Sequence, residues 1–391
     1  MSCLFPSGKT EDLIRERGPL TVAAFMESAL YDQDAGYYAR AAQRSGRAGD
    51  FFTSVDVGAM FGELLEIQLA EMAGILGAAT AAHADRSFTA DSAVAFDLVE
   101  AGAGNGRLSS DILRAAQRRD PLLYERTRLH LVEAGASPRD AQRAALGEVA
   151  DRLASSGAAL PASFEGVLLA NELLDAFPVH QVVMRAEGLR EVYVDVSDDR
   201  LVARDGPLST PALRDYLDRL GVTLEPGWRV EINLLALDWI RDVASRLRRG
   251  FVVLIDYGHE ARELYSATHA GGTLTTFSRH TMAGPEAARQ TPPWLQNPGE
   301  QDITAHVDFT SIRAAADAAG LQTLGFLDQT YFLLALAGAA GVEHCDTLKK
   351  RLALKTLLMP GGLGSTHKVL ILGKGIGTPA LLGCSFRIRV T

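Results

Sequence analysis

The chain has 391 residues, more than the roughly 250–300 over which a single hydrophobic core usually extends, so one elaborated domain or two lobes are expected. Hydrophobic residues make up 47% and charged residues 22%, which is typical of a folded globular protein. A formal net charge of −9 argues against the basic surface that nucleic-acid binding normally requires.

The cysteines and the apolar runs indicate the cellular compartment in which the protein resides. Cys3, Cys345 and Cys384 are far apart and lack the spacing of a zinc site or a disulfide framework, so we expect no metal and a reducing environment. The longest apolar runs are far shorter than the roughly 20 residues that span a bilayer, and the N-terminus resembles no secretion signal. These patterns predict a cytoplasmic protein with no membrane or nucleic-acid partner.

The first part of the chain predicts helices. Thr21 can cap a helix over VAAFMESALY, and a second helix is expected from about residue 57 to 76. Between them lies a loop rich in glycine, aspartate and aromatic residues, 32–54.

From Val94 the pattern changes to strands that alternate with helices. Strands are predicted over 94–100, 128–134 and 164–172, and amphipathic helices follow the first two, over 108–119 and 139–156. This repetition predicts a parallel sheet with crossover helices.

The rest of the chain predicts additions to this sheet and its completion. Residues 179–197 read as an antiparallel hairpin, and a helix over 229–248 leads into a buried strand over 250–258. Residues 265–307 are rich in loops, and the order helix, strand, helix, helix, strand closes the chain.

The turn after the first sheet strand indicates a nucleoside site. Glu100, Gly102, Gly104 and Gly106 form an E-x-G-x-G-x-G pattern, in which glycines let the backbone approach a ligand at a helix N-terminus. A dinucleotide fingerprint would place its third glycine at position 107, which is Arg107, so an NAD-dependent dehydrogenase is disfavoured.

Polar residues also follow the neighbouring strands. Glu133 ends the second strand, where a carboxylate can accept both hydroxyls of a ribose, although a surface acid is the simpler interpretation. Asn171 and Glu172 end the third strand at the same sheet edge; they could equally cap the following helix and complement its dipole.

Several segments together resemble the MidA-like family of S-adenosylmethionine (SAM) dependent methyltransferases. They include AGYYA, GDFFTS, NELLDAFP, LIDYG and DITAHVDF, within residues 18–309. The resemblance implies an α/β, Rossmann-like methyltransferase fold with an N-terminal helical segment and inserted antiparallel and helical elements. We expect the chain to divide into a helical segment with a cofactor-covering loop over 1–92, a methyltransferase domain over 93–375 with insertions at about 179–248 and 265–307, and an unexplained tail over 376–391.

The resemblance implies SAM as cofactor, and protein arginine methylation for the mitochondrial members, whose target is a core subunit of complex I. This sequence departs from the family pattern at its turn, which reads G-A-G-N-G rather than G-P-G-R-G. The acceptor is therefore open: a protein side chain, or a small molecule methylated on oxygen or nitrogen in a biosynthetic pathway. A non-catalytic SAM-binding assembly factor is a third hypothesis, and a homodimer is also considered.

The expected site residues follow from these motifs. Arginine is a difficult acceptor because its guanidinium stays protonated, so carboxylates are needed to fix it, and a histidine or tyrosine could serve beside the methyl group. The predicted catalytic residues are Glu172, Asp256, Tyr257 and His259. The predicted cofactor-binding residues are Thr53, Ser54, Glu100, Gly102, Gly104, Gly106, Glu133 and Asn171.

Overall fold

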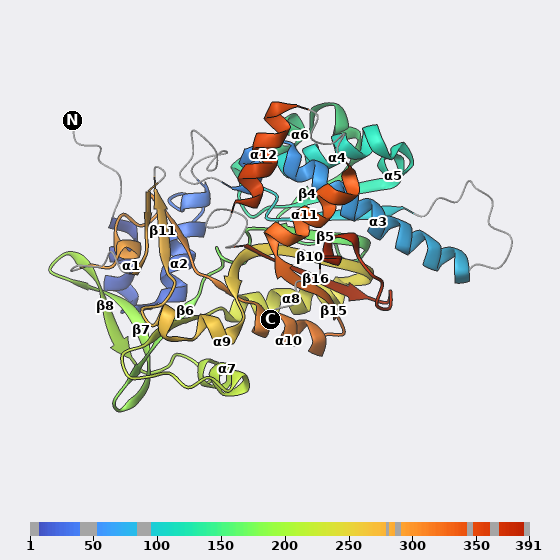
Figure 1. Ribbon diagram of the computed structural model, residues 1–391. Coiled ribbons are helices and arrows are strands. Elements are labelled where there is room, and N and C mark those ends of the chain that lie inside the picture. Colours follow the sequence, from blue (N-terminus) through green and yellow to red (C-terminus); the bar gives the residue numbers. More distant parts are fainter. Residues whose placement is uncertain are drawn as a thin grey trace. The chain divides into compact units, whose positions relative to one another are not determined.

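The computed structural model describes residues 8–39, 53–83, 95–278, 281–285, 291–341, 347–359 and 367–386. These residues form two compact units (Figure 1). The insert unit consists of the described residues within 1–52, 174–239 and 258–312, and the sheet unit of those within 53–173, 240–257 and 313–391. Residues 40–52, which hold most of the predicted covering loop, lie outside the described residues.

The sheet unit is built on a predominantly parallel sheet with the strand order β15-β16-β10-β5-β2-β3-β4. Along this path β16 alone runs in the opposite direction to the other strands. Its strands are β2 (Phe96–Ala101), β3 (Thr127–Val132), β4 (Leu153–Gly157), β5 (Phe164–Asn171), β10 (Leu247–His259), β15 (Gln322–Asp328) and β16 (His367–Lys374). From β2 the chain proceeds outward to β3 and β4, and then returns to β5 on the other side of β2. Ligands bind at such a switch point, outside the carboxyl ends of the strands.

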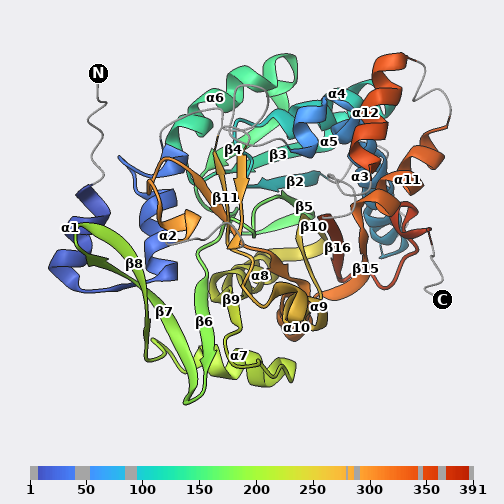
Figure 2. The same ribbon diagram turned by 60° about the vertical axis from the view of Figure 1, so that its left-hand side comes forward.

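Helices cover this sheet because their apolar sides need a partner. Figure 2 shows α3 (Met60–His83), α4 (Arg107–Arg119) and α6 (Ala136–Leu146) on one side of it. One core joins α3 and α4 to the sheet through residues such as Leu64, Ile112 and Val167, which are at most 2% exposed. The other helices with residues in this unit are α5 (Pro121–Arg126), α8 (Leu234–Arg246), α10 (Phe309–Ala318), α11 (Gln329–Ala340) and α12 (Leu348–Leu358). The predicted α/β architecture, a largely parallel sheet covered by helices, is thereby confirmed.

The insert unit is built on an antiparallel sheet (Figure 1). Its strands are β1 (Leu20–Thr21), β6 (His180–Arg185), β7 (Gly188–Ser197), β8 (Arg200–Gly206) and β9 (Arg229–Ile232). Helices α1 (Gly8–Arg17), α2 (Val22–Tyr31), α7 (Ala212–Leu220) and α9 (Ala261–Leu264) and the short strands β11 (Thr275–Ser278), β12 (Thr281–Ala283), β13 (Asp302–Thr304) and β14 (Val307–Asp308) complete it. A second core packs α2 residues such as Phe25 and Met26 with Val192 and Trp294.

The structure confirms three predictions that were made from local sequence patterns. The hydroxyl oxygen of Thr21 accepts the N–H of Ala24 at 3.1 Å, so it caps α2 as predicted. The predicted hairpin is β6 and β7, which pair antiparallel with Arg185 opposite Gly188. The final five elements also occur in the predicted order, from α10 to β16.

Two predicted helices were wrong in part: one ends earlier than predicted and the other begins later. Helix α6 ends at Leu146, where Gly147 takes φ 57°, and part of the predicted helix instead forms β4 beside β3. Residues 229–232 form β9 rather than helix, because they pair with β6. Strand partners from elsewhere in the chain override local helical preference at both places.

The C-terminal tail has a structure that no sequence pattern predicts. The backbone N–H groups of Leu382 and Gly383 donate to Glu71 and Gln68 on α3, at 2.9 and 2.8 Å. Leu381 is buried in the core of the sheet unit.

Among the described helices, none combines the length and the hydrophobicity needed to span a lipid bilayer.

Candidate functional site

The glycine turn joins the end of β2 to the start of α4, at the switch point of the sheet. Gly102, Gly104 and Gly106 have φ angles of 70°, 50° and 80°, a region that favours glycine. A Cβ on Gly102 would lie 3.0 Å from Leu173 Cδ1, and one on Gly106 would lie 3.1 Å from Leu131 Cδ1. A Cβ on Gly104 would meet no atom of the other described residues within 4 Å, its two chain neighbours apart. The middle glycine therefore faces space that a ligand can enter.

Glu133 holds this turn from the neighbouring strand. Its Oε2 accepts the N–H of Gly104 at 2.9 Å, and its Oε1 accepts the N–H of Gly135 at 2.8 Å. Each carboxylate oxygen has a second lone pair available, so these contacts are compatible with the predicted binding of ribose hydroxyls.

Gln142, on α6, holds the same turn and was not predicted. Its Nε2 donates to the carbonyl of Gly104 at 2.8 Å, and its Oε1 accepts from Ser156 Oγ at 2.7 Å. A lone glutamine in a helix gives no signal from which this role could be recognised.

Glu100 lies beneath the turn rather than at its surface. Its carboxylate accepts from the backbone N–H of Ser109 at 3.2 Å and from the Ser109 hydroxyl, so it stabilises the first turn of α4. Burial raises the pKa of Glu100 to about 7; the hydrogen bonds from Ser109 oppose this rise, and the nearby carboxylate of Glu133 adds to it. The predicted cofactor contact at Glu100 remains a prediction.

The end of β5 carries a residue with an unusual backbone conformation. Glu172 has φ 51°, which is uncommon for a side chain larger than glycine and often marks a functional position. Its N–H donates to the carbonyl of Ile255 at 2.8 Å. Asn171 Nδ2 donates to Glu172 Oε1 at 3.3 Å, and Asn171 Oδ1 is a buried acceptor with no hydrogen-bond donor among the described residues.

Asp256, near the end of β10, supports the same edge. Its Oδ2 accepts the N–H of Leu173 at 3.1 Å, and its Oδ1 accepts the N–H of Tyr257 at 2.8 Å. The Tyr257 ring lies on the ring of His367, with 3.9 Å between the centroids. His367 is fully buried, and its Nε2 lies 3.5 Å from Glu172 Oε1. A histidine at the start of the last strand gave no signal in the sequence.

Thr53 and Ser54 are engaged in contacts within the sheet unit. The N–H and hydroxyl of Thr53 both donate to Asp56, at 3.0 and 3.1 Å, and Asp56 pairs with Arg107 at 3.0 Å. Ser54 Oγ accepts from Gln329 Nε2 at 3.1 Å. These contacts attach the short helix Ser54–Val57 to the start of α4, and the predicted contact with the cofactor remains a prediction.

His259 belongs to a different group from the other predicted catalytic residues. It lies in the insert unit with His269 and His306, and its Nδ1 is 3.0 Å from Glu263 Oε1. Burial, with the neighbouring rings of His259 and His269, lowers the pKa of His306 to about 4. The fold thus brings Glu172, Asp256 and Tyr257 together in one unit and His259 to a histidine cluster in the other.

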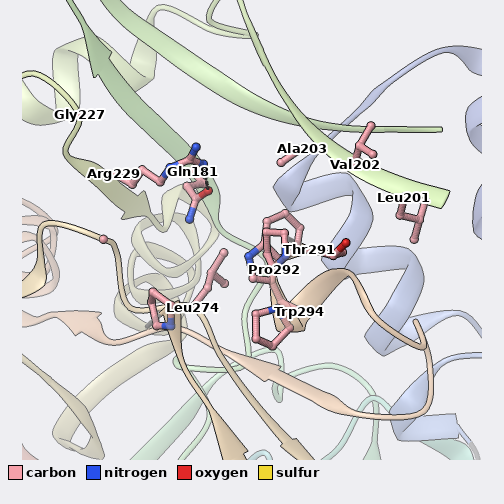
Figure 3. A pocket seen from close by; sticks show the side chains of 13 residues that line it. Gln181, Leu201, Val202, Ala203, Gly227, Arg229, Leu274, Thr291, Pro292 and Trp294 are labelled. Carbon is pink, nitrogen blue, oxygen red and sulfur yellow. Dashed lines mark hydrogen bonds between the residues drawn. The ribbon is translucent and has the colours of Figure 1, made fainter. Parts of the chain in front are cut away.

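The insert unit also contains a pocket of about 560 Å³, shown in Figure 3. Gln181 and Arg229 from the antiparallel sheet and Leu274, Pro292 and Trp294 from the following loops line it. Arg229 donates to Gln181 Oε1 at 3.4 Å, so the polar groups on its wall contact each other. Its volume is in the range of small-molecule sites.

Comparison with known proteins relates this geometry to a family. Residues 80–327 match the family model described as putative S-adenosyl-L-methionine-dependent methyltransferase. The chain is 30% identical to the mitochondrial protein arginine methyltransferase NDUFAF7 of Rattus norvegicus over 347 residues, covering 82% of this chain and 71% of that protein. It is 28% identical to the Homo sapiens protein of the same name, covering 82% and 70%.

A solved structure extends the similarity to nearly the whole chain. A Burkholderia thailandensis protein crystallised with bound S-adenosyl-homocysteine is 29% identical, with a TM-score of 0.82. The match covers 96% of this chain and 93% of that one.

Proposed function

The chain belongs to the family of S-adenosyl-L-methionine-dependent methyltransferases, and on this premise we propose that it methylates an arginine side chain of a protein. The rat and human relatives are named protein arginine methyltransferases, which supports this acceptor. The observation that carries the proposal is the Glu172 carboxylate at the carboxyl end of β5, held on a backbone with φ 51°.

The residues of the sheet unit fit the cofactor. SAM, when bound, supplies a methyl group on a positively charged sulfonium. Gly104 leaves open space at the turn, Glu133 offers carboxylate oxygens for hydroxyl groups, and Asn171 offers a buried acceptor. We assign these three residues to cofactor binding.

Glu172 is the residue that we assign to the acceptor. A guanidinium keeps its proton at neutral pH, and a carboxylate can bind two of its N–H groups and localise its charge. The Glu172 side chain is 10% exposed, and contacts with Asn171 and His367 restrict its orientation. Asp256 uses both carboxylate oxygens to accept backbone N–H groups beside Glu172, so we assign it a positioning role.

The test compares Glu172→Gln with the wild-type protein. Purified protein is incubated with methyl-labelled SAM and arginine-containing peptides, and the hydrolysed products are analysed for methylarginine. We expect the variant to lose about 100-fold or more in kcat, because an oriented charge that stabilises the transition state is removed. Its affinity for S-adenosyl-homocysteine, measured by calorimetry, should stay within about threefold of wild type. Glu125→Gln, at an exposed glutamate, is the matched control and should be fully active.

Two outcomes would contradict the proposal. If the Glu172→Gln variant methylated arginine as fast as the wild type, Glu172 would not have the role that we assign to it. If the wild-type protein labelled small molecules but no peptide, the acceptor would be a small molecule, and the assignment of SAM as the methyl donor would stand. The pocket in the insert unit favours including this second candidate, so the assay contains a panel of small hydroxy and amino compounds.

The predicted cytoplasmic location and homodimer remain predictions. The relatives above are named as mitochondrial proteins, so a fractionation experiment on the source cells would decide the location.

A further inference from the structure

Three histidines that are distant in the sequence lie together in the insert unit. His259 ends β10, His269 ends a short helix at Ala267–His269, and His306 lies between β13 and β14. One ring nitrogen from each lies within 4.8 Å of the other two. The ring centroids are 4.9 Å apart for His259 and His269, 5.3 Å for His259 and His306, and 5.8 Å for His269 and His306.

The backbone that carries two of these histidines is held by a close strand contact. Strands β10 and β14 pair in parallel, with Gly258 opposite Val307. A Cβ on Gly258 would lie 2.2 Å from the carbonyl oxygen of Val307, so this approach requires glycine. The pairing brings His259, which follows Gly258, close to His306, which precedes Val307.

A buried polar network fixes His306 further. Its backbone N–H donates to Thr273 Oγ1 at 3.1 Å. The N–H and hydroxyl of Thr273 in turn donate to Glu231 Oε2, at 2.7 and 2.9 Å. Glu231 and Thr273 are both buried, so His306 is attached to a rigid part of the unit.

Contacts with oxygen atoms of Glu263 restrict the orientation of the other two rings. His259 Nδ1 lies 3.0 Å from a carboxylate oxygen of Glu263, and His269 Nδ1 lies 3.1 Å from the Glu263 carbonyl oxygen. Histidines that bind metals commonly have an oxygen partner of this kind at one ring nitrogen. His306 Nδ1 is buried and has no hydrogen-bond partner among the described residues.

We propose that His259, His269 and His306 bind a divalent transition-metal ion of the zinc type. Three imidazole nitrogens suit Zn²⁺ and its neighbours, whereas Mg²⁺ and Ca²⁺ prefer oxygen ligands. Zn–N bonds of about 2.0–2.1 Å in a tetrahedron place the nitrogens about 3.3 Å apart. Small rotations of the rings would bring the nitrogens, now within 4.8 Å, to this separation. Three protein ligands leave a fourth position for water or another ligand.

This proposal departs from the expectation of no metal. The three residues are 10 and 37 positions apart, so no spacing pattern reveals them. The fold alone brings them together, and the site is independent of the arginine-methylation proposal.

The experiment measures Zn²⁺ binding to the full-length protein. Any polyhistidine tag is removed, the protein is treated with EDTA and dialysed, and Zn²⁺ is titrated in competition with a chromophoric chelator. His269→Gln and His306→Gln each remove one ligand. His130→Gln is the matched control, because His130 lies in the sheet unit with its Nδ1 2.8 Å from Ser155 Oγ. Urea unfolding of each variant establishes that it is folded.

We expect one Zn²⁺ per wild-type chain, with affinity reduced about 100-fold or more in each ligand variant and unchanged in His130→Gln. A large excess of Mg²⁺ should not compete. The proposal would be overturned if the wild-type protein failed to bind Zn²⁺ at concentrations of about 10 μM. It would also be overturned if the wild type and both ligand variants bound Zn²⁺ equally well. His269 lies on a short helix with no buried residue, so its variant remains informative if His306→Gln does not fold.

Discussion

Replacing Glu100 with glutamine is expected to make the sheet unit less sensitive to pH. The residue is 4% exposed, and burial, opposed by the Ser109 hydrogen bonds and assisted by Glu133, raises its pKa to about 7. Glutamine keeps the shape and an oxygen that can accept from Ser109, but it does not titrate in this range.

The sign and size of the effect follow from the two pKa values of Glu100. In the unfolded chain its pKa is near the ordinary value of 4.5, and in the folded protein it is about 7. The folded protein therefore keeps a proton that the unfolded chain releases, so stability decreases as the pH rises from about 4.5 to about 7. The difference corresponds to about 3 kcal/mol, most of it lost between pH 5 and 8.

Hydrogen exchange followed by mass spectrometry is the suitable assay. All three tryptophans, Trp228, Trp239 and Trp294, lie in the insert unit, so hydrogen exchange reports more directly than fluorescence on the elements around Glu100. The opening free energy of peptides from β2 and α4 should fall by roughly 2–3 kcal/mol between pH 5 and 8 in the wild type. Most of this fall should be absent in Glu100→Gln and present in the control Glu125→Gln. An equal fall in Glu100→Gln and the wild type would refute the reasoning.

Three further substitutions test other parts of the structure. Gly104→Ala places a methyl group where, among the described residues, only the chain neighbours lie within 4 Å. Calorimetry should therefore show affinity for S-adenosyl-homocysteine reduced about tenfold or more, with only about 1 kcal/mol of destabilisation. Unchanged affinity would mean that no ligand approaches the turn. Burial acts to raise the pKa of Asp97, but hydrogen bonds, including one from Arg128, outweigh burial and lower it. Asp97→Asn should therefore lose about 1–3 kcal/mol at pH 7 in urea unfolding, and the loss should shrink as the pH falls below 3.8; a loss independent of pH would contradict this. Gly383→Ala would place a Cβ 2.2 Å from the Phe332 ring. The free energy of unfolding should therefore fall by about 1–3 kcal/mol, measured as a lower midpoint of thermal unfolding. An unchanged midpoint would show that the tail is not packed there.

Sequence patterns predict the fold well where the deciding contacts are local. The glycine turn, the Thr21 cap and the β6–β7 hairpin depend on residues within a few positions of each other. Strands β4 and β9 form because they pair with other strands, β3 and β6, and local helical preference was misleading there. The packing of the tail on Gln68 and Glu71 is likewise a long-range contact without a local pattern.

The candidate site divides in the same way. Glu133 and Glu172 could be placed at one sheet edge because parallel strands end there together. His367 and Gln142 could not, since each comes from a separate element and has no motif of its own. The strained backbone of Glu172 is also invisible in the sequence, because glutamate has no preference for a positive φ.

The antiparallel pairing of β1 with β7 has a consequence for synthesis on the ribosome. Leu20 pairs with Val194, so the partner of the N-terminal strand is made 174 residues later. At about 5–20 residues per second, this delay is roughly 10–35 s. During that time the apolar side of α2, including Phe25 and Met26, has no native sheet to cover it. The hydrophobic core around α2 can therefore form only after most of the insert unit has been synthesised.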